Sequence, residues 1–88
     1  MTKEEIFAVL KKHIYGQLEG EIQESDIALN KSIMDLGANS LDIVEIVSNT
    51  IRELRIKVPR EELVTVKNIQ GLVDKFFEYR ESKKHDSV

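Results

Sequence analysis

The sequence of 88 residues has no cysteine, one proline, four glycines and only 6% aromatic residues. Without cysteine there is no disulfide framework, no thiolate metal ligand and no protein-borne thiol nucleophile, which fits a reducing compartment. No apolar run approaches the ~20 residues that a membrane-spanning helix needs. The first residues carry acids where a signal peptide needs a basic and then an apolar stretch. The sequence therefore predicts a cytoplasmic protein that does not bind a membrane.

Length and charge narrow the class of protein further. A chain this short buries only a little over half of its unfolded surface, so it cannot enclose a deep active site beside an adequate core. The net charge of -3 argues against nucleic acid, whose phosphates attract a basic patch. Between Glu19 and Glu45, however, seven acids accompany a single lysine, Lys31. We therefore expect a monomeric binding or carrier module whose function lies in this acidic region.

Two stretches near the ends of the chain have the apolar spacing of amphipathic helices. The first begins with a capping box of Thr2 and Glu5, and Gly16 and Gly20 bracket its end. The other is capped by Thr65 and runs to about Glu81. Their apolar stripes are Ile6, Phe7, Leu10, Ile14 and Leu18 in the first, and Val66, Ile69, Leu72, Val73, Phe76 and Phe77 in the second.

A third amphipathic helix is predicted over residues 40–54. Asn39 is a good N-cap for it, with Asp42 three residues later. At about 100° per residue, one arc of this helix is apolar and the opposite arc is polar. Leu41 lies off the apolar arc and Val44 at its margin, so both border an acidic face. The apolar arc holds Ile43, Ile46, Val47, Thr50 and Leu54.

The remaining segments complete an all-α fold. Residues 19–39 have no sustained period, and we expect a long connection whose scattered apolar residues hold it against the core, with a short helix that the pattern does not place. Residues 54–58 alternate but lack a partner strand, so a loop is expected. Pro59 is a suitable first residue of a short helix that ends at Leu63 or Val64.

Together these elements predict an antiparallel four-helix bundle with three main helices, a short third helix and a long first loop. We expect one domain over residues 1–81. Residues 82–88 are charged and small, and should form a frayed tail.

Residues 35–45 read Asp-Leu-Gly-Ala-Asn-Ser-Leu-Asp-Ile-Val-Glu. This segment closely resembles the prosthetic-group attachment site of acyl carrier proteins, usually Asp-Leu-Gly-x-Asp-Ser-Leu followed by an acidic helix, and the order of elements matches along the whole chain. The resemblance implies that Ser40 carries 4′-phosphopantetheine, whose terminal thiol holds acyl groups as thioesters. It also implies an attachment motif of Asp35, Leu36, Gly37, Asn39, Leu41 and Asp42.

The residues of this motif suit such an attachment. A serine in the first turn of a helix lies beside free backbone N–H groups and the positive end of the helix dipole, which favours a phosphate. Gly37 allows a sharp approach to the helix, and Leu36 can anchor the loop. Taken alone, Ser40 is more typical of a helix cap, and it is the surrounding motif that favours attachment.

Asn39 stands where the family usually has Asp. With Ile51 and Arg52 in a helix that is more acidic in fatty-acid carriers, it favours a discrete carrier of a polyketide or other specialised pathway. A fatty-acid-type carrier and aminoacyl or peptidyl cargo remain open, as does a neutral variation at Asn39. A protein-interaction module that never bears the cofactor is an alternative of a different class.

The resemblance also implies partner contacts through Leu41, Val44, Glu45 and Ser48. The expected partners are a phosphopantetheinyl transferase that uses coenzyme A, and an acyltransferase, ketosynthase or related synthase enzyme. An exposed leucine beside acids suits a transient, charge-steered encounter. Asp42 and Glu45 are equally typical of solvated residues at a helix start.

No catalytic residue and no metal site is predicted. His13 and His85 lie far apart in the sequence, without a third ligand or an orienting group at a recognisable spacing. We therefore expect a carrier that performs no catalysis itself.

Overall fold

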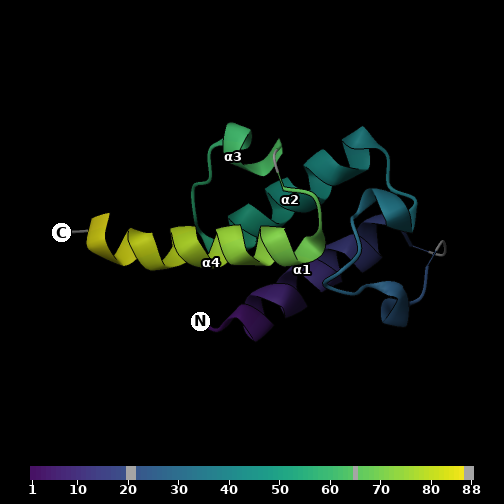
Figure 1. The fold of residues 1–88 in the computed structure, drawn as a ribbon, viewed down its shortest axis with the longest axis horizontal. Helices are drawn as coiled ribbons and strands as arrows, with labels where there is room; N and C mark the ends of the chain where they lie inside the picture. The colour runs from purple at the N-terminus through teal and green to yellow at the C-terminus, as the bar shows by residue number, and fades with distance from the viewer. Residues whose placement is uncertain (20–21, 65, 87–88) are drawn as a thin grey trace.

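The computed structural model describes residues 1–19, 22–64 and 66–86, and does not describe the side chains of residues 60, 64 and 82–86. Helix α1 spans Lys3–Gln17, α2 Ser40–Leu54, α3 Arg60–Val64 and α4 Ile69–Asp86 (Figure 1). Two short 3-10 helices, η1 (Glu24–Asp26) and η2 (Met34–Leu36), lie between α1 and α2. Within the described residues there is no strand. The predicted all-α fold with three long helices and a short third one is confirmed.

The apolar stripes of the three long helices meet in one core. Helix α1 packs against both α2 and α4, and α3 contacts α4. Phe7 and Phe77 are only half-buried, and the ammonium groups of Lys11 and Lys3 lie 4.9 and 5.4 Å from their ring centres. The side chains with no exposed surface are Ile6, Leu10, Ile14, Ile46, Thr50, Ile69 and Phe76.

The capping box of α1 is present as predicted. The backbone N–H of Glu5 donates to Thr2 Oγ1 at 3.1 Å, and that of Thr2 donates to Glu5 Oε1 at 2.8 Å. These bonds hold the pKa of the Glu5 carboxyl below its ordinary value, because the ionised form accepts the Thr2 N–H.

The predicted limits of the last helix are wrong at both ends. Thr65 lies outside the described residues, and α4 begins at Ile69, where the Oδ1 of Asn68 accepts the N–H of Gly71 at 2.8 Å. A Cβ at Gly71 would lie 2.7 Å from the Val66 side chain, so glycine lets the approaching chain pack closely here. At the other end the backbone stays helical to Asp86, beyond the predicted end near Glu81. The frayed tail over 82–88 stays a prediction.

The long connection between α1 and α2 crosses the start of α4. The carbonyls of Lys31 and Leu29 accept the N–H groups of Ile69 and Gln70 at 2.8 and 2.9 Å, which satisfies two free donors of that helix. The expectation that all its apolar residues are held against the core is wrong for Leu29 and Met34, which are 37% and 64% exposed. The residues of the connection that are buried in the core are Ile27, Ile33, Leu36 and Ala38, and the partly buried Ile22 packs against that core.

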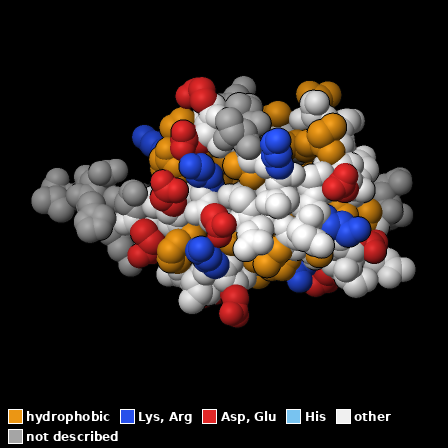
Figure 2. Space-filling model, in the orientation of Figure 1, with side chains coloured by type: hydrophobic (Ala, Val, Ile, Leu, Met, Phe, Trp, Pro, Cys, Tyr) orange, Lys and Arg blue, Asp and Glu red, His pale blue; other side chains and the backbone are white. Residues whose placement is uncertain are grey.

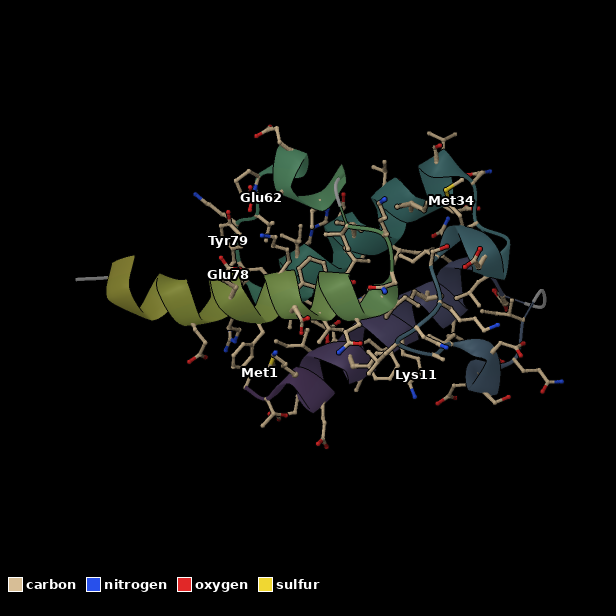
Figure 3. The ribbon with its side chains drawn as sticks, viewed as in Figure 1. Met1, Lys11, Met34, Glu62, Glu78 and Tyr79 are labelled. Atoms are coloured by element: carbon tan, nitrogen blue, oxygen red, sulfur yellow. The ribbon has the colours of Figure 1, made fainter. Side chains whose placement is uncertain are left out.

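Helix α3 begins one residue later than predicted. Pro59 precedes it, and its carbonyl accepts the N–H of Glu62 at 3.0 Å. Lys75 of α4 forms an ion pair with Glu62 at 3.0 Å and holds the pKa of that carboxyl below its ordinary value. Tyr79 of α4 also helps to lower the pKa of Glu62, and both side chains lie where α3 faces α4 (Figure 3). Polar contacts thus fix this short helix to α4.

Candidate functional site

The turn that leads into α2 is set by η2 and Gly37. Gly37 has φ +101°, a backbone conformation that a residue with a side chain rarely adopts. Leu36 is 8% exposed and anchors the turn in the core, as predicted. The side chain of Asp35 accepts the N–H of Ser32 at 3.2 Å, while Ser32 Oγ accepts the N–H of Asp35 at 3.0 Å. Asp35 therefore stabilises this turn through a local cap.

The N-cap predicted for α2 is present as a reciprocal pair. Asn39 Oδ1 accepts the N–H of Asp42 at 2.8 Å, and Asp42 Oδ2 accepts the N–H of Asn39 at 3.2 Å. The other oxygen of Asp42 accepts the side-chain amide of Gln17, in α1, at 3.0 Å. The bond from Gln17 and then the one from Asn39 lower the pKa of the Asp42 carboxyl. No local sequence pattern links Gln17 to residue 42, so this contact could not be predicted from the sequence.

Ser40 is the first residue of α2, and its side chain is exposed. Among the N–H groups at the start of α2, that of Asp42 donates to the Asn39 side chain, and that of Ile43 donates to the carbonyl of Asn39 at 3.0 Å. Among the described residues nothing accepts the N–H groups of Ser40 and Leu41. Two free N–H donors and the positive end of a 15-residue helix thus lie beside the hydroxyl. This donor set fits a covalently attached phosphate.

An exposed apolar surface surrounds the start of α2. Leu41 is 77% and Val44 46% exposed, as expected from their places on the helix. Met34, which the sequence pattern assigned to the core, adds a third exposed apolar side chain near this end of α2 (Figure 3). Figure 2 shows hydrophobic side chains gathered over this part of the molecule, with charges of both signs interspersed elsewhere on the same face. Glu45 is exposed and Ser48 half-buried.

A cavity of about 520 Å³ separates α2 from α3 and the start of α4, and it is partly open to solvent. Met34 and Val44 line it as well as being exposed, so it adjoins the apolar surface beside Ser40. Its volume is within the range of roughly 300–1,000 Å³ typical of small-molecule sites. Residue patterns did not reveal it, because it depends on how the helices are spaced. Its further apolar lining is Ile33, Ile43, Val47, Ile51, Val58, Leu63, Val66 and Leu72.

Of the two histidines considered in the sequence, the described one, His13, takes part in a contact between α1 and α2. His13 Nε2 lies 2.8 Å from Glu53 Oε1, and Lys12 forms an ion pair with the same carboxylate at 2.8 Å. Lys12 and then His13 lower the pKa of Glu53, which joins α1 to α2. The side chain of His85 lies outside the described part. Within the described residues no three His, Asp or Glu side chains are grouped so that they could hold a metal ion. None of the described helices combines the length and the apolar character that a membrane span requires.

Comparison with known proteins agrees with this geometry. The family model of the phosphopantetheine attachment site matches residues 14–76, which is more than half of the chain. The chain therefore belongs to this family of carrier domains, whose cofactor is covalently attached 4′-phosphopantetheine. It is 35% identical over 78 residues to the polyketide biosynthesis acyl-carrier-protein AcpK of Bacillus subtilis (strain 168), a match that covers 89% of this chain and 94% of the relative. The resemblance to acyl carrier proteins noted in the sequence is confirmed.

Proposed function

We propose that this chain is an acyl carrier protein of a polyketide-type pathway and that Ser40 bears its phosphopantetheine. The observation that carries the proposal is the exposed Ser40 hydroxyl at the start of α2, beside two N–H groups without a described acceptor. The family match spans this residue, and a polyketide carrier is among the relatives. When attached, 4′-phosphopantetheine supplies a terminal thiol that holds an acyl group as a thioester.

The chain contributes a nucleophile to the attachment but no catalytic group. In the step catalysed by a phosphopantetheinyl transferase, Ser40 Oγ forms a bond to the phosphorus nearer the pantetheine of coenzyme A. The bond from that phosphorus to the bridging oxygen breaks, adenosine 3′,5′-bisphosphate leaves, and the hydroxyl proton passes to a base of the transferase. The exposure of Ser40 and its place at a helix N-terminus support this role.

The partner surface is proposed to comprise Leu41, Val44, Glu45 and Ser48. Leu41 supplies an exposed apolar anchor, and the exposed Glu45 one turn later supplies charge. Such a surface suits brief encounters with the transferase and with an acyltransferase, ketosynthase or related enzyme, because charge speeds association while a small apolar contact gives modest affinity. A cytoplasmic location stays a prediction.

The deciding experiment is the intact mass of the chain after incubation with coenzyme A and a broad-specificity phosphopantetheinyl transferase. The wild type should gain one phosphopantetheinyl group. Ser40→Ala should gain none, while its stability changes by no more than about 0.5 kcal/mol, because Asn39 supplies the cap. Ser25→Ala, at another exposed serine, is the matched control and should be modified like the wild type. A wild type of unchanged mass would overturn the proposal and favour an unmodified interaction module.

A further inference from the structure

We infer that the side-chain amide of Asn39 donates a hydrogen bond to the phosphodiester formed on Ser40. This inference rests on the proposed function, because it requires the group to be attached at Ser40. It assigns a binding role to the residue at which this chain departs from the usual attachment motif.

The capping bond fixes which end of the Asn39 amide is available. Its Oδ1 accepts the backbone N–H of Asp42 at 2.8 Å, so this atom must be the oxygen of the amide. The Nδ2 group therefore points away from that N–H, and no described residue accepts a hydrogen bond from it. Since the side chain of Asn39 is exposed, its two N–H bonds remain available to an outside acceptor.

The contacts of Asp42 stabilise the turn of backbone to which the Asn39 amide is hydrogen-bonded. One oxygen of Asp42 accepts the backbone N–H of Asn39 at 3.2 Å, and the other accepts the side chain of Gln17 at 3.0 Å. The Asp42 carboxylate is thus engaged on both oxygens and is held at the cap by α1 as well as α2. The residue that follows Asn39 in this stabilised turn is Ser40.

The side chain at residue 39 determines whether a phosphate on Ser40 lies beside an N–H donor or beside a negative charge. A phosphodiester is an anion, and an amide N–H donates to it without charge repulsion. An aspartate at this position would cap α2 equally well but would place a second negative charge beside the phosphate. Asn39 therefore keeps the cap and adds a third N–H donor to those of Ser40 and Leu41.

The direct test is the side-chain ¹H–¹⁵N spectrum of the chain before and after attachment of the unloaded cofactor. We expect one of the two Nδ2 protons of Asn39 to shift downfield in the modified protein. Asn49 is an internal control, because its Oδ1 is also engaged, by the Arg52 side chain at 3.3 Å, and it lies on α2 more than two turns from Ser40 and outside the cavity lining. Its side-chain protons should shift less than those of Asn39.

The second test compares the melting temperatures of unmodified and modified protein. In Asn39→Asp the unmodified form should melt at or above the wild-type temperature, because the cap is retained. The change in Tm on attachment should then be roughly 2–6 °C less favourable in Asn39→Asp than in the wild type. Asn39→Ala loses the cap in both forms and has neither the amide donor nor a negative charge. Its change in Tm on attachment should therefore lie between those of the wild type and Asn39→Asp.

Intact mass separates the outcomes. In one outcome the protein gains the phosphopantetheinyl mass while the Asn39 Nδ2 resonances stay unchanged and the Tm of Asn39→Asp responds to attachment as that of the wild type does. In that case the inference is wrong and the proposed function stands. If no mass is gained, both are wrong.

Discussion

The side chain of Gln17 donates a hydrogen bond to Asp42 across 3.0 Å and so joins the last turn of α1 to the first turn of α2. Asp42 is at the same time half of the capping pair with Asn39. The start of the helix that presents Ser40 is therefore held by a tertiary contact as well as by its own cap.

Replacement of Gln17 by alanine should raise the pKa of the Asp42 carboxyl toward its ordinary value, because the hydrogen bond from Gln17 is the main cause of its lowering. A ¹³C-detected carboxyl titration measures this directly. Gln70→Ala is the control, since Gln70 is an exposed glutamine on another helix. It should leave the titration of Asp42 unchanged. An identical titration in wild type and Gln17→Ala would show that the contact does not form in solution.

Acid should destabilise the fold. In the part of the chain that the structure describes, four carboxyls have a pKa lowered by a hydrogen-bond partner: Glu5, Asp42, Glu53 and Glu62. Because the pKa of each is lower when folded than when unfolded, the unfolded chain binds more protons between the two values, and stability rises with pH there. The contribution of these carboxyls to the free energy of unfolding is complete above the ordinary carboxyl pKa of about 4. It is lost as the pH falls through the lowered pKa values of the folded state.

Thermal unfolding between pH 7 and pH 2 measures this dependence. The Tm should change little down to about pH 5 and fall below about pH 4. In Glu53→Gln the side chain at residue 53 cannot be protonated in this pH range, so the decrease in Tm at low pH should be smaller than in the wild type. A Tm that stays level to pH 2 would contradict the lowered values.

Features that depend on neighbours in the sequence could be predicted from it. The capping pairs at Thr2 and Asn39 link residues three apart, and the stripes of the helices repeat every three or four residues, so both are visible locally. The attachment motif is likewise a continuous segment. The start of α4 was misplaced because its first N–H groups find acceptors at Leu29 and Lys31, some forty residues earlier in the chain.

Features that depend on the spacing of helices could not be predicted. The bond between Gln17 and Asp42 and the cavity between α2 and α3 require the packed arrangement. The exposure of Met34 could not be predicted for a related reason. In a segment without periodicity, the sequence does not indicate whether an apolar side chain faces the core or the solvent. It is 64% exposed, although its neighbour Ile33 is buried.

Gly37 and Gly16 should respond in opposite directions to alanine. A Cβ at either would meet no atom within 4 Å, so only the backbone differs: Gly37 has φ +101°, whereas Gly16 lies within α1. Gly37→Ala should cost about 1–2 kcal/mol of unfolding free energy through strain. Gly16→Ala should add up to about 1 kcal/mol, because alanine favours the helix. Urea unfolding measures both, and equal effects of the two changes would refute the assigned left-handed turn.

The cavity should shelter an apolar acyl chain. With an octanoyl group loaded on the modified protein, the methyl resonances of Leu72 and Ile51, which line the cavity, should shift. Val47→Phe fills part of the space and should remove these shifts, at a cost of about 1–3 kcal/mol in stability. Acetyl-loaded protein is the control, since so short a group should leave these methyls unperturbed. Unshifted methyls in the octanoyl form would place the chain in solvent.

Leu41 should matter for partner recognition and not for folding. At 77% exposure it contributes little to the core, so Leu41→Ala should keep its unfolding free energy within about 0.5 kcal/mol of the wild type. The kcat/KM for modification by the transferase should fall about tenfold, the effect of losing an apolar anchor worth about 1.4 kcal/mol. Tyr15→Ala removes an exposed aromatic side chain, 44% exposed, from a different helix, α1, and should leave kcat/KM unchanged. Equal losses in both variants would indicate a general effect of surface hydrophobicity, whereas a loss in Leu41→Ala alone would place the docking contact beside Ser40.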